Sequence, residues 1–183
     1  MATRCTLVGM PGSGKSTVGR HLARRLGCDF VDMDQQLEQR LGCSIRSYFE
    51  ARGEAAFRAH EAALLAELAA QPGPIVLSTG GGVVLRADNR ALLRTHCAPV
   101  FYLRANADEI FHRLRHDRKR PLLQVDNPQE RLRLLFRERD PLYREVAHYV
   151  METRRASVQA LVSRVQMQLE MAAPDGAGGP VPG

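Results

Sequence analysis

The stretch "GMPGSGKST", residues 9–17, carries the spacing Gly-x-x-x-x-Gly-Lys-Ser, which is typical of a phosphate-binding P-loop. Glycine lets the backbone come close to a ligand, so that successive amide N–H groups can point at one anion. A helix that begins at the end of the loop adds its N-terminal dipole and its unpaired N–H groups. The stretch therefore predicts a site for phosphate groups near the start of the chain.

The segments on both sides of this loop support the same interpretation. Before it comes "RCTLVG", an apolar run short enough to be a buried strand. After it, Val18, Leu22 and Leu26 are spaced by four and form one apolar face of a helix. Gly27 then stands where a glycine often ends a helix. The alternative is a glycine-rich turn that binds nothing, but strand, loop and helix together are the setting that a P-loop requires.

Lysine is rare in this chain, which uses arginine for most of its positive charge. Lys15 and Lys119 are the only lysines. A lysine ammonium is a compact charge on a thin stem, whereas the planar guanidinium of arginine would crowd a ring of amides. We therefore expect Lys15 to hold phosphate charge, and Ser16 to offer its hydroxyl to Mg²⁺.

Length and composition limit the class of protein. A chain of 183 residues is expected to form one domain, over 1–171, with a disordered Gly- and Pro-rich tail at 172–183. We see no apolar run that could span a membrane and no signal peptide. None of the four cysteines forms a C-x-x-C pair, so we expect a cytoplasmic protein with reduced thiols.

The formal net charge of +6 suits anionic ligands. Nucleic acid is disfavoured because aromatic residues make up only 5% of the chain and offer few surfaces for base stacking. Small phosphorylated molecules are the better expectation.

Strand-like apolar runs recur along the chain and alternate with helical patterns. They lie at 4–9, around 29–32, at 75–79, at 99–104 and around 148–151. Such alternation predicts an α/β fold with a five-stranded parallel sheet between two layers of helices. Ligands of these sheets bind at the carboxyl ends of the strands, so the residues that follow each strand are the candidates for the binding site.

The second strand is followed by "VDMDQQ". Asp32 and Asp34 are two residues apart and would point the same way in an extended chain. Two carboxylates near a phosphate loop suggest a metal ligand and a catalytic group. The alternative is that Asp34 caps the helix that follows.

The third strand is followed by three glycines, Gly80, Gly81 and Gly82. We expect their backbone N–H groups to approach a ligand, and the alternative is a flexible loop. Because Ser78 and Thr79 stand where many P-loop enzymes carry a metal-binding acid, Asp32 is the better candidate for that role.

A helix is predicted around 54–70, with Phe57, Leu64, Leu65 and Leu68 on its apolar face. Arg58 and Glu61 are three residues apart and can meet. From spacing alone, a solvated ion pair of little energetic weight is as good a prediction as a functional one.

Five basic residues lie between 113 and 120, followed by Pro121. The sharper interpretation is a mobile lid over phosphates at about 113–126, and the alternative is a solvated face. Asn127, Pro128 and Glu130 predict a helix start. In that helix Arg139 ends an apolar face just before Asp140-Pro141, where we expect the helix to break, so Arg139 should point into a cleft or, alternatively, extend to solvent.

Together these motifs resemble the shikimate kinase family. The matching stretches are "GMPGSGKSTVGRHLA", "DMD", "FR" at 57–58, "STGGG", "KRPLL" and "RDPLYREVA", in family order over nearly the whole chain before the tail. The resemblance implies a P-loop kinase fold with a lid and a substrate-binding helical region. It also implies transfer of the γ-phosphoryl group of ATP to the 3-hydroxyl of shikimate, with Mg²⁺, as a step of aromatic amino-acid biosynthesis.

The resemblance also implies a role for each site residue. Lys15 and the amides of the loop hold the β- and γ-phosphates; Ser16 binds Mg²⁺ directly and Asp32 through water. Asp34 holds the substrate hydroxyl as the plausible base, and Arg58 and Arg139 grip the carboxylate of shikimate beside the amides of Gly80, Gly81 and Gly82. Arg120 reaches from the lid to the transferred phosphoryl group. The implied ATP-binding residues are Gly12, Ser13, Gly14, Lys15, Ser16, Thr17, Arg113, Arg120 and Arg155, the last in an adenine loop around 153–155 that lacks a proline.

Other functions stay open at this point. Another small-molecule or nucleotide kinase of the same fold, for example a gluconate kinase, is the main alternative, but a neutral or cationic substrate would leave two arginines without partners. A GTPase is disfavoured because the chain has no N-K-x-D guanine motif. A nucleic-acid-binding ATPase would need basic residues together with aromatic ones. We expect a monomer.

Overall fold

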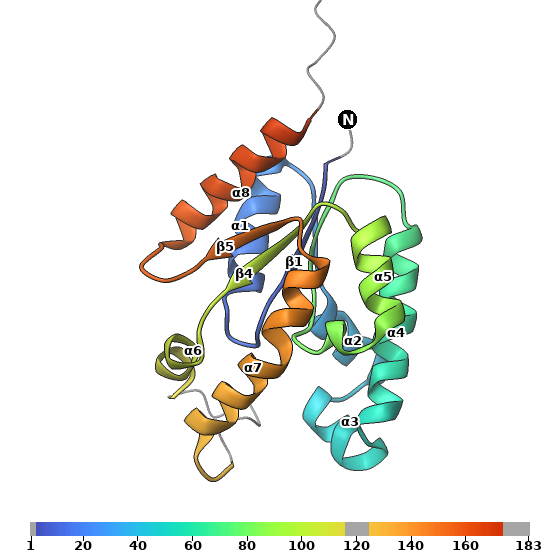
Figure 1. The fold of residues 1–183 in the computed structure, drawn as a ribbon. Helices are drawn as coiled ribbons and strands as arrows, with labels where there is room; N and C mark the ends of the chain where they lie inside the picture. Colours follow the sequence, from blue (N-terminus) through green and yellow to red (C-terminus); the bar gives the residue numbers. More distant parts are fainter. Residues whose placement is uncertain (1–2, 116–124, 174–183) are drawn as a thin grey trace, which may run out of the picture.

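The computed structural model describes residues 3–115 and 125–173. Within them, five parallel strands form one sheet in the order β2-β3-β1-β4-β5 (Figure 1). The strands are β1 (Arg4–Val8), β2 (Asp29–Asp32), β3 (Ile75–Ser78), β4 (Val100–Arg104) and β5 (Tyr149–Glu152). The predicted five-stranded parallel sheet is therefore confirmed, and each strand lies within one or two residues of its predicted position.

Helices connect the strands and cover both faces of the sheet (Figure 1). The α-helices are α1 (Lys15–Leu26), α2 (Met33–Leu41), α3 (Ile45–Arg52), α4 (Glu54–Ala70), α5 (Ala87–His96), α6 (Ala107–Leu114), α7 (Pro128–Val146) and α8 (Val158–Ala172), with a short 3₁₀ helix η1 (Val83–Leu85). The predicted helix at 54–70 and the glycine C-cap of α1 at Gly27 are both confirmed.

Two separate apolar cores hold the layers together. On one face, Val18 and Leu22 of α1 and Leu161 and Val165 of α8 pack on the sheet. On the other face, side chains of α2, α4, α5, α6 and α7 form the larger core. The strands serve both cores because their side chains alternate: Phe101 belongs to the first core and Tyr102 to the second. The three central strands, β3, β1 and β4, are thus buried on both faces.

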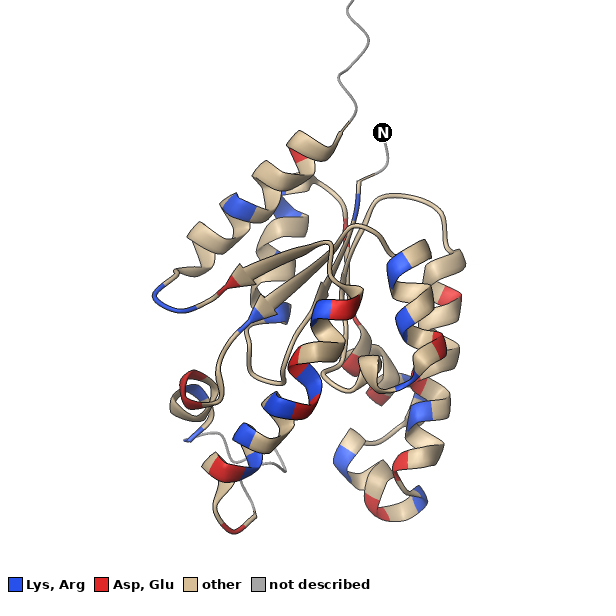
Figure 2. Cartoon of the chain, in the orientation of Figure 1, with Lys and Arg blue, Asp and Glu red and all other residues tan. Residues whose placement is uncertain are grey.

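The distribution of charge agrees with this burial. Figure 2 shows acidic and basic residues of both signs spread over the helices, while the charged positions of β4 and β5 lie at the ends of the strands. On α7 the two signs alternate instead of forming a single basic stripe (Figure 2).

The strand order brings the functional segments together. β1 pairs with both β3 and β4, and Thr6 to Val8 run in register with Val100 to Tyr102. The P-loop after β1, the start of α2 after β2 and the glycines after β3 therefore share the carboxyl edge of the sheet, where ligands of such sheets bind.

The expected break at Asp140-Pro141 is wrong. α7 continues through Pro141 to Val146. A proline inside a helix removes one hydrogen bond and costs roughly 3 kcal/mol. Here the turn after Pro141 buries Tyr143 and Val146 completely or almost so, and Asp140 binds side chains on β4, which offsets that cost.

The extended arrangement expected for Asp32 and Asp34 is also wrong. β2 ends at Asp32, and Asp34 already lies in the first turn of α2. The helix cap is Asp32, whose carboxylate accepts a hydrogen bond from the Gln35 N–H at 3.2 Å. The alternative that Asp34 caps the helix is therefore wrong, and its carboxylate does not serve as the N-cap of α2.

Two predicted segments lie largely outside the described residues. Of the predicted lid at 113–126, Arg113 and Leu114 form the last turn of α6, and 116–124 are not described. Of the predicted tail at 172–183, Ala172 ends α8 and 174–183 are not described. Among the described helices, none combines the length and the apolar character needed to cross a membrane.

Candidate active site

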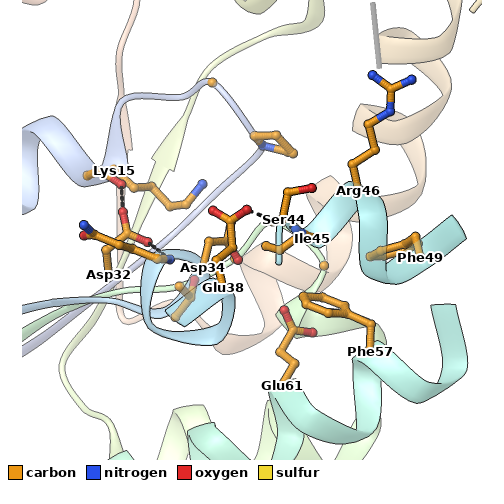
Figure 3. A pocket seen from close by; sticks show the side chains of 18 of the residues that line it. Lys15, Asp32, Asp34, Glu38, Ser44, Ile45, Arg46, Phe49, Phe57 and Glu61 are labelled. Carbon is orange, nitrogen blue, oxygen red and sulfur yellow. Dashed lines mark hydrogen bonds between the residues drawn. The ribbon is translucent and has the colours of Figure 1, made fainter. Parts of the chain in front are cut away.

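A cleft of about 1030 Å³ opens at the carboxyl edge of the sheet (Figure 3). Its walls come from the P-loop, α2, α3, α4, the segment after β3, and α7. Most of the predicted site residues line it together: Gly12, Gly14, Lys15, Ser16, Thr17, Asp32, Asp34, Arg58, Gly80, Gly81, Gly82 and Arg139. Residues from five separate segments thus meet in one cavity.

The P-loop curls around its own lysine. Gly14 caps α1 with φ of 95°, a left-handed conformation that glycine adopts without strain. The Lys15 ammonium donates to the carbonyl oxygens of Gly9 and Met10, each at 2.8 Å, and the side chain is 7% exposed. This arrangement holds a single positive charge at the N-terminus of α1, where an anion is also favoured by the helix dipole.

A small oxygen cluster lies beside the lysine. The Ser16 hydroxyl donates to Asp32 Oδ2 at 2.6 Å. The Ser78 hydroxyl oxygen lies 3.5 Å from the Ser16 hydroxyl oxygen. Mg²⁺ in phosphoryl-transfer sites takes one or two protein oxygens, with phosphates and water completing its shell. The Ser16 hydroxyl, at the start of α1, and the Asp32 carboxylate, at the end of β2, are in contact and are oxygen ligands of the kind that Mg²⁺ takes.

Asp34 lines the cleft between Lys15 of the P-loop and the segment after β3 that carries Gly80 (Figure 3). Burial raises its pKa above the usual range for an aspartate. Lys15 opposes that rise, since a nearby positive charge favours the carboxylate, while the negative charge of Asp32 adds to it. A carboxylate with a raised pKa is a better proton acceptor than an exposed one.

The three glycines leave room for side chains that converge on the cleft. A Cβ on Gly80 would lie 2.6 Å from Asp34 Oδ1, and one on Gly81 would lie 2.6 Å from Pro11 Cδ. A Cβ on Gly82 would overlap the guanidinium of Arg58. The segment therefore packs closely against its neighbours, and the alternative of a flexible loop with no packing role is wrong.

Arg58 and Glu61 form a largely buried ion pair, so the alternative of a solvated pair is wrong. Arg58 Nη1 donates to Glu61 Oε1 at 2.9 Å, and the Glu61 side chain is only 1% exposed. Arg58 also reaches Glu54 at 3.2 Å and lies over the rings of Phe49 and Phe57. Burial raises the pKa of Glu61, while Arg58 lowers it. These contacts fix the guanidinium at the wall of the cleft.

Arg139 points into the cleft, as predicted, and not to solvent. Its Nε is buried and makes no hydrogen bond within the described part of the chain. Tyr143, one turn further along α7, donates its hydroxyl to the Gly81 carbonyl at 2.5 Å and is fully buried. Burial raises the pKa of Tyr143 to about 12, and Arg139 opposes that rise. Tyr143 thus ties α7 to the glycine segment beside Arg139.

Some predicted site residues lie apart from the cleft wall. Ser13 is buried within the loop, where its N–H donates to the Met10 carbonyl at 3.1 Å. Arg113 lies beside the P-loop and donates to the carbonyls of Gly12 and Ser13 at 3.3 and 3.1 Å. Arg155 is exposed in the turn after β5. Arg120 falls outside the described residues.

The cleft also contains acidic, basic and aromatic residues that were not predicted as site residues. They include Glu38, Arg46, Phe49, Glu54, Glu61 and Arg131 (Figure 3 labels most of them). Glu61 could have been found: it follows Phe57 by four residues and precedes Leu64 and Leu68 by three and seven, which places it on the apolar face of α4. A charged residue on such a face calls for a buried partner.

Comparison with known proteins agrees with this geometry. The family model described as shikimate kinase matches residues 11–170. The chain is 58% identical over 168 residues to a shikimate kinase of Paracidovorax citrulli, covering 91% of each chain. It is 53% identical over 165 residues to one of Burkholderia pseudomallei, covering 90% of this chain and 89% of the relative.

Solved structures give the same result. A shikimate kinase from Acinetobacter baumannii in complex with shikimate superposes with a TM-score of 0.86 at 41% identity, covering 94% of this chain and 96% of that one. A gluconokinase from Sinorhizobium meliloti, at 16% identity and a TM-score of 0.54, covering 94% of this chain and 98% of that one, shares the fold alone. By the family match and by these identities, the chain belongs to the shikimate kinase family.

Proposed function

We propose that this chain transfers the γ-phosphoryl group of ATP to the 3-hydroxyl of shikimate, giving shikimate 3-phosphate and ADP. One observation carries the proposal beyond family membership: a single cleft joins a P-loop at one end to two arginines, Arg58 and Arg139, at the other, with Asp34 between them. Phosphoryl transfer depends on positioning and on stabilisation of charge more than on covalent chemistry. A cleft with this order of residues supplies both.

The nucleotide end is assigned to the P-loop. We propose that the amides of Gly12, Ser13, Gly14 and Thr17 and the ammonium of Lys15 hold the phosphates of ATP. Ser16 and Asp32 would hold Mg²⁺, which, when bound, offsets the negative charge of the phosphates. This division agrees with the 2.6 Å contact between the two side chains.

Asp34 is assigned to the hydroxyl of the acceptor. Its carboxylate would orient the 3-hydroxyl and take its proton as the oxygen attacks the γ-phosphorus. The raised pKa of Asp34 supports this role, because proton transfer is most effective when the base has a pKa nearer to the working pH.

The two arginines are assigned to the carboxylate of shikimate. Arg58 is oriented by Glu61, and Arg139 reaches the cleft with its Nε buried and without a hydrogen bond in the described residues. Guanidinium groups bind carboxylates through paired, charge-assisted hydrogen bonds that fix orientation as well as affinity. The glycines at 80–82 then line the ring between these groups.

The roles proposed for the outer residues are those that the family resemblance implies. We propose that Arg113 and Arg155 contact the nucleotide from outside the P-loop, and that Arg120 contacts the transferred phosphoryl group from a lid. We also propose a cytoplasmic monomer that binds neither nucleic acid nor membrane, which size-exclusion chromatography at several concentrations tests for the oligomeric state.

The function is tested by measuring ADP release with shikimate, gluconate and nucleoside monophosphates as acceptors. We expect turnover with shikimate and background rates with the others. Lys15→Met should reduce that turnover by about a thousandfold or more, as expected for loss of a charge that acts on the transferred group. Faster turnover with gluconate or with a nucleotide than with shikimate would show that the acceptor is wrong.

A further inference from the structure

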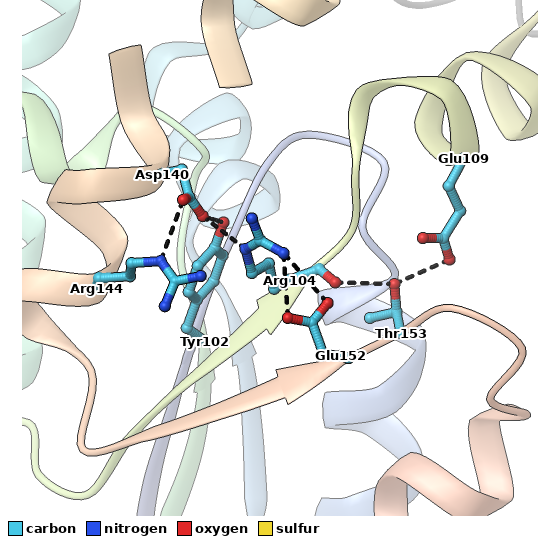
Figure 4. A network of polar contacts seen from close by, with 7 residues as sticks. All are labelled: Tyr102, Arg104, Glu109, Asp140, Arg144, Glu152 and Thr153. Atoms are coloured by element: carbon cyan, nitrogen blue, oxygen red, sulfur yellow. Dashed lines mark hydrogen bonds and ion pairs between the residues drawn. The ribbon is translucent and has the colours of Figure 1, made fainter. Parts of the chain in front are cut away.

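A chain of polar contacts runs from α6 through Thr153 to the carboxyl end of β4 and to α7 (Figure 4). At its near end, Arg113 donates from Nη1 to the P-loop carbonyls and from Nη2 to Glu109 Oε1 at 2.8 Å. At its far end, Arg104 and Asp140 link β4 to α7. Glu109 lies where these two parts of the chain meet.

Glu109 is held by two donors from different elements. The Arg113 guanidinium approaches from the next turn of α6. The hydroxyl of Thr153, the residue after β5, donates to Glu109 Oε1 at 2.9 Å (Figure 4). Thr153 is 1% exposed, its N–H donates to the Arg104 carbonyl at 3.1 Å, and its Oγ1 lies 3.3 Å from the same carbonyl oxygen. Because Thr153 is fixed to β4 in this way, the carboxylate it binds is fixed as well.

The position of Glu109 is not explained by the stability of its helix. Asn106 caps α6 and accepts from the Glu109 N–H at 2.8 Å, so an acid three residues after the cap would be expected to turn back towards the Asn106 backbone. The carboxylate turns to Thr153 and Arg113 instead. Its second oxygen is buried and makes no hydrogen bond within the described residues, which is costly for stability.

The helix that carries Glu109 also lies directly on the P-loop. A Cβ on Gly12 would lie 2.8 Å from Leu114 and 3.2 Å from Ile110, so the two segments are in close contact. The nearest side-chain atom to a Cβ on Gly14 would be Arg113 Nη1, at 3.7 Å. The position of the Arg113 guanidinium is therefore set by two contacts: the packing of α6 on the P-loop, and the hydrogen bond to the Glu109 carboxylate.

We propose that Glu109 is a positioning residue for the nucleotide: with Thr153, it holds the Arg113 guanidinium against the edge of the P-loop, where the guanidinium meets the base or sugar of the bound nucleotide. Glu109 itself touches neither substrate. The inference rests on the proposed role of Arg113 and deepens it, because it adds a carboxylate and a threonine on which nucleotide affinity depends and shikimate affinity does not.

The test measures the dissociation constant for ADP by calorimetry, together with kcat and both KM values, in Glu109→Gln. Glutamine keeps the size of the side chain and one acceptor but loses the charge. We expect the ADP dissociation constant and the KM for ATP to rise roughly three- to tenfold, the range expected for coupled neighbouring side chains. The KM for shikimate and kcat should stay within twofold of the parent. Asp108→Asn is the matched control, because it removes an exposed carboxylate from the same turn of α6. It should leave the ADP dissociation constant, kcat and both KM values unchanged.

Two further variants separate positioning from folding. Thr153→Val should weaken ADP binding in the same direction as Glu109→Gln, and Thr153→Ser, which keeps the hydroxyl, should restore it. In an Arg113→Ala background, Glu109→Gln should have no further effect on ADP binding, because its action passes through the guanidinium.

The outcomes distinguish this inference from the proposed function. If the parent binds ADP, and Arg113→Ala weakens that binding while Glu109→Gln does not, the inference is overturned and the nucleotide site stands. An equal loss from Glu109→Gln with and without Arg113 also overturns it, since the carboxylate would then act by another route. A parent protein that binds no ADP would overturn the nucleotide site itself, and the inference with it.

Discussion

Glu61, 1% exposed on α4, accepts a hydrogen bond from Arg58 Nη1 at 2.9 Å and thereby places a guanidinium at the wall of the cleft. A buried carboxylate of this kind is costly unless it is paired, and the pairing restricts Arg58 to one orientation. The second partner of Arg58, Glu54, is mostly exposed and can yield to another carboxylate. This geometry supports the proposal that Arg58 binds the carboxylate of the substrate.

Glu61→Gln should raise the KM for shikimate by about tenfold or more, because a charge-assisted contact is worth about 1.5–3 kcal/mol and the variant loosens one. The KM for ATP should not change. Steady-state kinetics with each substrate varied in turn provide the measurement. Glu67→Gln is the control: Glu67 lies on α4, as Glu61 does, and pairs with Arg40 of α2, but it is 60% exposed. Equal effects of the two variants would mean that burial of the pair has no bearing on the substrate.

Gly82→Ala and Gly81→Ala should affect different substrates. A Cβ at position 82 overlaps the end of a flexible side chain, Arg58, which can move at the expense of its grip, so the KM for shikimate should rise about tenfold. A Cβ at position 81 meets Pro11 of the P-loop, including its backbone nitrogen at 3.1 Å, so the KM for ATP should rise instead. The same pattern of kinetic change in both variants would contradict this assignment.

Asp34→Asn should lower kcat by about a hundredfold or more, since asparagine can orient a hydroxyl but cannot accept its proton. ADP binding, measured by calorimetry, should change much less. A kcat close to that of the parent would show that Asp34 only positions the acceptor.

The same variant should change the stability of the ligand-free protein in a pH-dependent way. The pKa of Asp34 is raised in the folded state, so folding takes up a proton between the ordinary pKa of about 3.9 and the raised value. The stability that Asp34 provides is complete below the ordinary pKa and is lost as the pH rises through the raised one. Asp34→Asn should therefore have a higher Tm than the parent at pH 7, and the difference should shrink at acidic pH. A lower Tm at pH 7 would contradict the direction of the shift.

Arg139→Ala should weaken the response of the enzyme to the charge of its substrate. The parent should phosphorylate an uncharged amide analogue of shikimate poorly, and the variant should discriminate less between amide and acid, since part of the grip is already gone. The ratio of kcat/KM values for the two compounds is the measurement. Arg137→Ala, an exposed arginine on the same helix, is the control. A parent that uses the amide as well as the acid would remove the case for a carboxylate grip.

Arg4→Ala should destabilise the fold without changing catalysis. The Arg4 guanidinium donates to the carbonyls of Leu68, Ala69 and Gln71 at the end of α4, and to that of His96 at the end of α5. These contacts lie at the start of β1, away from the cleft, and their loss should cost about 2–3 kcal/mol in the free energy of unfolding. Urea denaturation measures that cost, with exposed Arg164→Ala as the control. An unchanged midpoint would show that these caps contribute nothing.

The sequence by itself determined the order of the elements and the identity of the phosphate loop. Short apolar runs separated by helical patterns predicted all five strands, because a strand buried in a parallel sheet is apolar on both faces. The loop was equally readable: Gly12, Gly14, Lys15 and Ser16 are required by local backbone geometry and by short-range contacts to a phosphate. Such features depend on neighbours in the chain, so the chain alone reveals them.

Only the tertiary structure decided which side chains are buried and which partners they have. Arg58 and Glu61 look like a surface pair by spacing, yet Phe49 of α3 lies against Arg58 and the glycine segment after β3 lies against Glu61, which is 1% exposed. The helix through Pro141 continues because Tyr143 and Val146 are buried against other elements, a gain that local propensity does not include. Glu109 lies three residues after the cap Asn106, yet its carboxylate binds Thr153, which follows β5 more than forty residues later in the chain. In each case the energy of a contact between remote segments outweighed a local preference, and that energy can be assigned only when the packing is known.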